Sequence, residues 1–190
     1  MNTVVLDIEI QRSIDELPNG WNDTHLMGVS VAVLYEDDRD TFRVYGPDDL
    51  DLLKERLITA DRITGFNHVA FDLPVIWGMP RGQRVAQIPE DRCNDLLRRI
   101  WQAQGLNPNV FSDRHKGWGL DAVCLATLGR GKTGYGGDAP KWFQGGQWVK
   151  LIDYCLQDVA LTRDLDRFIS RYGYVLGSRG SRLSIPEWIR

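Results

Sequence analysis

Cysteine is scarce in this sequence, and segments that would carry the chain into a membrane are missing. The three cysteines (Cys93, Cys124 and Cys155) are far apart and form no C-x-x-C pair. This pattern favours reduced core residues over a disulfide framework or a zinc site. No apolar run approaches the ~20 residues of a membrane span, and "MNTVVLDIEI" lacks the basic start and cleavage site of a signal peptide. We therefore expect a cytoplasmic protein without a membrane partner.

A strong overall charge is also missing. The formal net charge is −3 and 43% of the residues are hydrophobic, as in ordinary soluble domains. The charge is uneven, because residues 1–78 hold 15 acidic and 6 basic side chains whereas residues 79–151 hold 11 basic and 6 acidic. One part of the surface is therefore suited to an anion, although the overall balance does not indicate a nucleic-acid binder. With no repeat and no linker, we expect residues 1–190 to form a single domain.

Alternating strand and helix patterns predict an α/β fold. Residues 3–10, "TVVLDIEI", read as a buried strand, and residues 25–46 read as two strands joined by the acidic turn 36–40. Helical patterns begin at Pro47, Asp72, Asn94 and Leu120, and the strand "DRITGFN" lies between the first two. A fifth strand is expected around residues 84–88 or near Asn109. The chain should end in a β-hairpin that turns near residues 178–181.

Residues 151–172 predict a long helix with an unusual buried face. Positions at helical spacing form the stripe Leu151, Tyr154, Asp158, Leu161, Leu165, Phe168 and Tyr172. A carboxylate buried among apolar residues costs several kcal/mol unless a cation pairs with it. The position of Asp158 therefore requires a partner, either an arginine or a metal ion.

Four carboxylates occupy positions that an ordinary structural role explains poorly. Asp7 and Glu9 share one face of the first strand, Asp72 follows the fourth strand, and Asp158 lies on the long helix. Taken singly, the strand residues could face water and Asp72 could be a helix N-cap. Together they would repel one another unless divalent cations lay between them. Hard oxygen ligands select Mg²⁺ or Mn²⁺, and a pair of such ions is a common device for phosphodiester hydrolysis.

Three short motifs in this order resemble those of DEDD-type 3′–5′ exonucleases. They are D-x-E at Asp7–Glu9, N-x-x-x-F-D at Asn67–Asp72 and Y-x-x-x-D at Tyr154–Asp158. The tyrosine places the resemblance in the DEDDy branch, nearest to the proofreading domains of family B DNA polymerases and their stand-alone relatives. The resemblance implies a ribonuclease H-like fold, with a mixed five-stranded sheet flanked by helices. It also implies two Mg²⁺ or Mn²⁺ ions in each site.

The same resemblance assigns roles to individual residues. Asp7 would bridge both ions, Glu9 and Asp158 would complete the first site, and Asp72 would hold the second. Tyr154 lies one helical turn before Asp158, so its hydroxyl can orient the attacking water.

The resemblance further implies a substrate and its contacts. Asn67 would support the edge of the site and Phe71 would pack beneath it. The substrate would be the 3′ end of single-stranded DNA or RNA, with DNA favoured, and the products nucleoside 5′-monophosphates. DNA repair is the expected setting, with a polymerase or helicase as a candidate partner.

The glycine-rich segment 129–146 supplies cations and aromatic rings for such a strand. Lys132 and Lys141 can attract phosphates, and Tyr135 and Trp142 can stack on bases.

Two alternatives remain open at the level of sequence. "ATLGRGKT", residues 126–133, fits the loose phosphate-loop pattern [AG]-x-x-x-x-G-K-[ST], but a helix precedes it where a strand is required. The chain could also be a non-catalytic nucleic-acid- or partner-binding module on the same fold.

Overall fold

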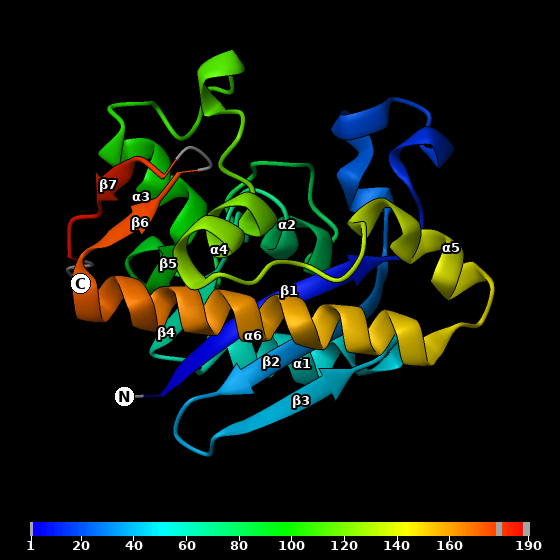
Figure 1. The fold of residues 1–190 in the computed structure, drawn as a ribbon. Coiled ribbons are helices and arrows are strands. Elements are labelled where there is room, and N and C mark those ends of the chain that lie inside the picture. The colour runs from blue at the N-terminus through cyan, green and yellow to red at the C-terminus, as the bar shows by residue number, and fades with distance from the viewer. Residues whose placement is uncertain (1, 178–179, 188–190) are drawn as a thin grey trace.

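A five-stranded mixed sheet forms the centre of the molecule in the computed structural model, which describes residues 2–177 and 180–187 (Figure 1). The spatial order of the strands is β3-β2-β1-β4-β5. Their bounds are β1 Thr3–Ile10, β2 Val29–Glu36, β3 Thr41–Tyr45, β4 Arg62–Gly65 and β5 Cys93–Asp95. The first three strands are antiparallel neighbours, whereas β4 runs parallel to both β1 and β5. The carboxyl ends of β1, β4 and β5 therefore meet at one edge of the sheet.

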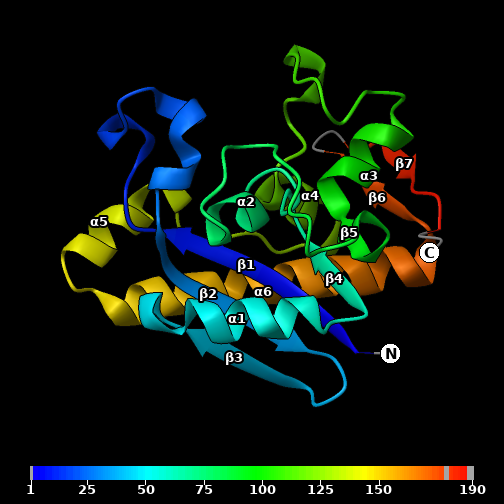
Figure 2. The ribbon, with the colours of Figure 1, turned by 180° about the vertical axis from the view of Figure 1, so that it is seen from behind.

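Helices cover both faces of this sheet. The long helix α6 crosses one face, and α1 lies on the opposite face, as the view from behind shows (Figure 2). The α-helices are α1 Leu50–Ile58, α2 Asp72–Ile76, α3 Leu96–Ala103, α4 Leu120–Leu128, α5 Ala139–Gln144 and α6 Trp148–Tyr172. Short 3-10 helices occupy Ile14–Glu16, Gly20–Leu26, Pro47–Asp49, Glu90–Arg92, Asp113–His115 and Gly136–Asp138. The part of the chain that the structure describes contains no helix both long and apolar enough to cross a membrane.

The side chains of β1 alternate between the two faces. Leu6 is buried in a cluster with Leu53 and Leu57 of α1, whereas Val5 is buried in a cluster with Leu151 of α6. Because Asp7 and Glu9 share the register of Val5, they point toward α6 and away from α1. This explains why their face of the strand lies against a helix rather than in bulk water.

The fifth strand lies elsewhere than predicted. Residues 84–88 are a loop whose Val85 and Ile88 are buried against the core without forming a strand, and residue 109 also lies in a loop. The strand is instead Cys93–Asp95, which pairs with β4. It is short and polar because Asn94 donates hydrogen bonds to Thr64 (3.0 Å) and to Asp166 on α6 (2.9 Å). A strand that uses polar contacts to join its neighbours leaves no hydrophobic pattern in the sequence.

The predicted stripe on α6 is correct in its first half and wrong at its end. Phe168 is half-buried and Tyr172 is 49% exposed, and both contact Tyr174. Ile169 takes their place in the core, and it packs with Leu161 and Leu165 against α3 and α4 rather than against the sheet. The helix therefore changes its packing partner along its length. Its first half faces the sheet and its second half faces the other helices.

A two-stranded hairpin of β6 Tyr174–Leu176 and β7 Arg182–Ser184 ends the described chain. The predicted hairpin is thus confirmed, whereas part of its predicted turn, residues 178–179, lies outside the described residues.

Candidate functional site

The D-x-E motif on β1 places two carboxylates beside α6. Glu9 is 6% exposed, and the ligand atoms of Asp7, Glu9 and Cys155 all lie within 4.8 Å of one another. The Cys155 thiol donates to the main-chain oxygen of Asp7 (3.4 Å) and lies 3.7 Å from its Oδ2 atom. Burial raises the pKa of Cys155 well above its usual range, so this thiol is protonated. The wet-face alternative for the two strand carboxylates is therefore wrong.

Asp72 enters the site from the turn between β4 and α2. It is the first residue of α2, and the N-cap position belongs to Phe71. Hydrogen bonds from the backbone of Asp72 itself and of Ile8 lower the pKa of the carboxylate, but less than burial raises it. Asp72 is also 5% exposed. The N-cap alternative for this residue is therefore wrong, and its burial still requires an explanation.

Asp158 and Tyr154 lie one helical turn apart on α6, both buried. The protein side chain that pairs with Asp158 is not the expected arginine but Lys132, whose ammonium donates to Oδ2 of Asp158 and to the Tyr154 hydroxyl (3.1 Å). The other oxygen, Oδ1, is buried and accepts no hydrogen bond from the described residues. Asp158 thus combines one cation partner with one unused acceptor.

Contacts of the loop that carries Lys132 hold this side chain beside Asp158. The backbone N–H of Lys132 donates to Oδ1 of Asp121 on α4 (2.7 Å). Gly131 leaves room for that contact, because a Cβ at this position would lie 2.3 Å from the same oxygen and the Asp121 carboxylate would have to move. From the sequence, Lys132 is expected to attract phosphates, whereas in the structure its ammonium contacts the carboxylate of Asp158.

The same loop excludes the phosphate-loop alternative. Residues 126–128 belong to α4, and residues 129–135 continue as an irregular segment rather than entering a helix. A phosphate loop needs a strand before it and a helix N-terminus after it. Neither flanks this segment.

A cavity of about 560 Å³ joins these residues. It is lined by all the predicted site residues, namely Asp7, Glu9, Asn67, Phe71, Asp72, Lys132, Lys141, Tyr154 and Asp158. Lys141 lies at the rim, where it is exposed and pairs with Asp138 (3.1 Å). Tyr135 is 75% exposed beside the cavity, whereas Trp142 packs edge-on against Tyr154 at 5.6 Å between ring centres. Trp142 therefore supports the tyrosine and is not a free stacking surface.

The carboxylates of this cavity resist ionisation. Removal from water, together with repulsion from Asp158 and Asp72, raises the pKa of Asp7 well above its usual range. Burial and the charge of Asp158 do the same to the pKa of Glu9. Burial raises the pKa of Asp72 to about 7. The ionised forms of these four acids are unfavourable in the absence of a cation. A bound cation would stabilise the ionised forms.

Lys132 supplies only part of the missing positive charge. Burial lowers its pKa, but attraction to Asp7 and Asp158 outweighs that effect, so its pKa is raised and the ammonium stays charged. Burial still raises the pKa of Asp158 despite this partner. One ammonium therefore does not neutralise four carboxylates.

The donor set fits divalent cations. The cluster offers hard carboxylate oxygens, which Mg²⁺ and Mn²⁺ prefer, and the Oδ1 atom of Asp158 is an unused buried acceptor. Asp7 and Glu9 already lie within a few ångströms of each other.

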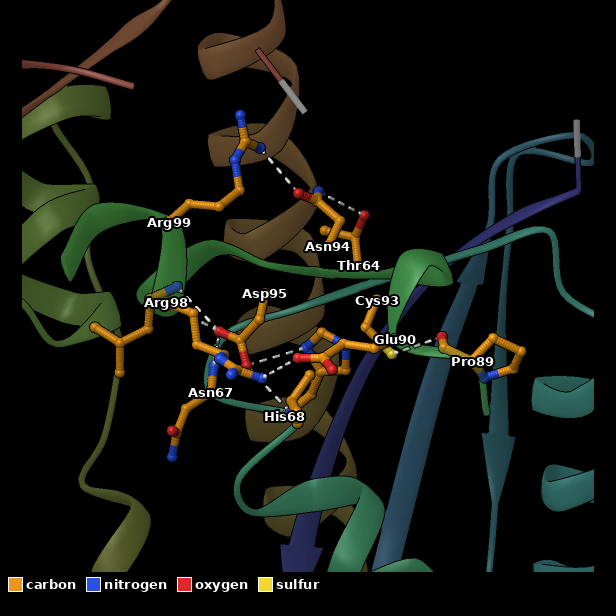
Figure 3. Close-up of polar contacts among 12 residues, drawn as sticks. Thr64, Asn67, His68, Pro89, Glu90, Cys93, Asn94, Asp95, Arg98 and Arg99 are labelled. Carbon is orange, nitrogen blue, oxygen red and sulfur yellow. Dashed lines mark hydrogen bonds and ion pairs between the residues drawn. The ribbon is translucent and has the colours of Figure 1, made fainter. Parts of the chain in front are cut away.

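A fifth carboxylate, Asp95, supports the site from behind and was not recognised in the sequence (Figure 3). Its two oxygens accept backbone N–H bonds from Asn67 (3.0 Å), Val69 (3.1 Å), Leu97 (3.1 Å) and Arg98 (3.2 Å). It therefore caps α3 and fixes the turn that leads to Asp72. Asn67 adopts a left-handed φ of 70° in this turn, a conformation that asparagine tolerates better than most residues. The N-cap signal ahead of α3 was visible in the sequence, but the second contact was not.

His68 fills the space between Asp95 and the sheet. It is fully buried, its Nδ1 lies 3.6 Å from Oδ2 of Asp95, and burial lowers its pKa. A Cβ at Gly65 would lie 2.7 Å from the His68 side chain, so only glycine allows this close approach. The histidine of the second motif thus packs the turn and does not enter the cavity.

We expect Asp95→Asn to lower the free energy of unfolding by about 2 kcal/mol, because Oδ1 accepts three of the four N–H bonds and Oδ2 the fourth, so the amide NH₂ would face at least one N–H group. Thermal denaturation checks this. Asp113→Asn is the matched control, since Asp113 is exposed and pairs with Lys116 at 2.6 Å, and its effect should stay within about 0.5 kcal/mol. Equal effects of the two substitutions would show that Asp95 does not hold the turn.

A scan against protein-family models finds no family that matches this chain, and a search of curated proteins finds no match either. The functional assignment therefore depends on the residues and their geometry.

Proposed function

We propose that this protein is a DEDDy-type 3′–5′ exonuclease with a ribonuclease H-like fold, which uses Mg²⁺ or Mn²⁺ to hydrolyse single-stranded nucleic acid. The observation that carries the proposal is the convergence of three distant motifs on one cavity. Asp7 and Glu9 come from β1, Asp72 from α2, and Tyr154 with Asp158 from α6. A strand order with three antiparallel strands followed by two parallel ones also fits that fold.

The carboxylates are the residues that would hold two divalent cations. When bound, such ions supply a hydroxide nucleophile and stabilise the charge on the phosphate and the leaving oxygen. Asp7 is the central ligand, because it lies against Glu9 and interacts with both Asp72 and Asp158. The cavity brings these groups together in a partly enclosed space, where charge interactions are stronger than in bulk water.

Tyr154 has the role of a donor in this proposal. Burial raises its pKa, so the phenol stays protonated at neutral pH and cannot act as the base. Its hydroxyl lies beside Lys132 and one turn from Asp158, where it can orient a water molecule by hydrogen bonding. Trp142 against its ring keeps it in this position.

The rim of the cavity suits a nucleic-acid strand. Lys141 and Tyr135 are exposed residues of the glycine-rich segment that line the cavity, and Asn67 and Phe71 line it too. We propose the 3′ end of single-stranded DNA as the preferred substrate, with RNA as the second candidate. A polymerase or helicase would then be the kind of partner that supplies such ends.

A 5′-labelled oligonucleotide tests this function. In Mg²⁺ or Mn²⁺ the wild type should shorten the strand one nucleotide at a time and release nucleoside 5′-monophosphates. A 3′-terminal phosphate should slow the reaction, because the 3′ end must enter the site. If DNA and RNA strands are both bound but never shortened, the chain is a binding module on this fold and the exonuclease proposal is wrong.

The stability of the metal-free protein should depend on pH. Asp72 has a pKa of about 7 in the folded protein, against an ordinary value of 3.8. The folded state therefore keeps a proton that the unfolded state releases, and stability should fall as the pH rises from about 4 to 7, by up to about 1.4 kcal/mol per pH unit.

Divalent cations should reverse this trend, because they bind deprotonated carboxylates. Thermal denaturation in EDTA and in Mn²⁺ at a series of pH values measures both effects. The difference in Tm between the two conditions should widen as the pH rises from about 5 to 8. A constant difference would show that the buried acids do not bind the metal.

A further inference from the structure

The insertion between β1 and β2, residues 11–28, forms a wall of the same cavity. The figures show it standing beside α5 at the carboxyl end of β1 (Figures 1 and 2). Gln144 of α5 ties the two together, because its side-chain amide donates to the Gln11 carbonyl (3.0 Å) and to Glu16 (2.9 Å). The 3-10 helix Gly20–Leu26 within it carries the cavity residue Trp21 at its second position. None of the three motifs includes this segment.

Trp21 is held in place although it is exposed. Its ring lies edge-on to Phe71 at 6.4 Å between ring centres, and the guanidinium of Arg81 lies over it at 4.8 Å. Behind it, Asp23 accepts hydrogen bonds from the backbone and the side chain of Asn19, both at 3.0 Å. Even so, 53% of Trp21 remains exposed. A large ring that is fixed on its edge and open toward a cavity is suited to stacking.

Arg81 adds a cation with no competing partner. Among the described residues, no acidic side chain lies within ion-pairing distance of it. The cavity is lined by the four carboxylates, by the indole of Trp21 and by the exposed side chain of Lys141, and the guanidinium of Arg81 lies over that indole. The ligand that matches this arrangement alternates flat rings with negative charges. The cavity volume of about 560 Å³ also lies within the range of small-ligand pockets, about 300–1,000 Å³.

We propose that Trp21, backed by Arg81, is a stacking platform for one unpaired base near the 3′ end of the bound strand. This proposal rests on the exonuclease function and narrows its substrate class. Every base has a stackable face, so the platform tolerates any sequence. In a duplex, however, neighbouring pairs cover both faces of a base, so the platform selects ends that are single-stranded or frayed.

Binding of a fluorescent single strand, followed by anisotropy, tests the platform. All proteins carry Asp7→Asn, so that hydrolysis does not remove the ligand. Trp21→Ala should weaken binding about tenfold, the size expected for one base–aromatic stack, and Trp21→Phe should restore most of it. Trp148→Ala is the matched control, because Trp148 is 42% exposed at the start of α6 and does not line the cavity. It should bind like the parent.

Strands that lack a single base test whether Trp21 contacts a base rather than the backbone of the strand. A strand that lacks the base at one of its last three positions should bind the parent about tenfold more weakly, while Trp21→Ala should show no further loss at that position. If Trp21→Ala and Trp148→Ala bind alike, or if every abasic strand weakens both proteins equally, the platform is wrong. Cleavage by the wild type would then show that the exonuclease function still stands. If the parent binds no strand and the wild type cleaves none, both proposals fail.

Discussion

Replacing Asp7 with asparagine should abolish hydrolysis and yet stabilise the metal-free protein. The activity should fall by a factor on the order of 10³ or more, because the central ligand of the cation site is lost. The metal-free fold should gain stability, since the amide of the variant would carry no charge toward Glu9, Asp72 or Asp158, whose repulsion raises the pKa of Asp7. Single-turnover cleavage of a labelled strand and thermal denaturation in EDTA measure the two effects.

Lost activity together with a higher Tm is informative, because a substitution that merely disrupts the fold lowers both the activity and the Tm. Asp153→Asn serves as the control, since Asp153 is exposed on α6 and accepts a hydrogen bond from Gln157 of the same helix (2.7 Å). It should change neither the rate nor the Tm by a measurable amount. An Asp7→Asn protein that still cleaves the strand, or that loses stability in EDTA, would contradict the role given to Asp7.

Replacing Lys132 with methionine should tighten the binding of divalent cations in the absence of nucleic acid. The ammonium of Lys132 lies on Oδ2 of Asp158, so it occupies one of the two ligand oxygens and repels an incoming cation. Without that competitor, we expect Mn²⁺ to bind about tenfold more tightly, a coupling of about 1.4 kcal/mol. Titration calorimetry with Mn²⁺ gives the affinity directly.

The same substitution should weaken the metal-free fold. It leaves Asp158 buried without its cation, which costs about 3 kcal/mol, the lower end of the range for a broken buried pair, because Lys132 keeps some contact with solvent. Lys150→Met is the matched control, since Lys150 is exposed and contacts Gln147 (2.8 Å). If Lys132→Met binds Mn²⁺ more weakly than Lys150→Met does, the ammonium assists the cation instead of competing with it.

Much of the fold could be predicted because hydrophobic periodicity reports burial. The first four strands and the helices α1 to α4 and α6 carry clear patterns, with a helix end at Gly129 in the left-handed conformation (φ 72°). The strand β5 was missed because Asn94 joins the sheet through polar contacts. Phe168 was misplaced because α6 changes from packing on the sheet to packing on helices, which a single stripe cannot describe.

Part of the candidate site could likewise be predicted from the sequence, and part could not. The spacing of the motifs located the five polar residues that line the cavity from β1, α2 and α6. The contact between Lys132 and Asp158 could not be predicted, because it depends on the path of an irregular loop tied to Asp121. The second role of Asp95 depends on a turn folded back from β4. Contacts between loops that are distant in sequence leave no periodic signal.

The claim that the carboxylate cluster is a divalent-cation site is tested most directly by counting bound manganese. Electron paramagnetic resonance of free Mn²⁺ gives this number for the wild type and for Asp7→Asn, each with a nucleoside 5′-monophosphate present. Our account predicts two ions per wild-type chain, as in other two-metal sites, and a clear loss in the variant. A wild type that binds no more manganese than Asp7→Asn does would contradict it.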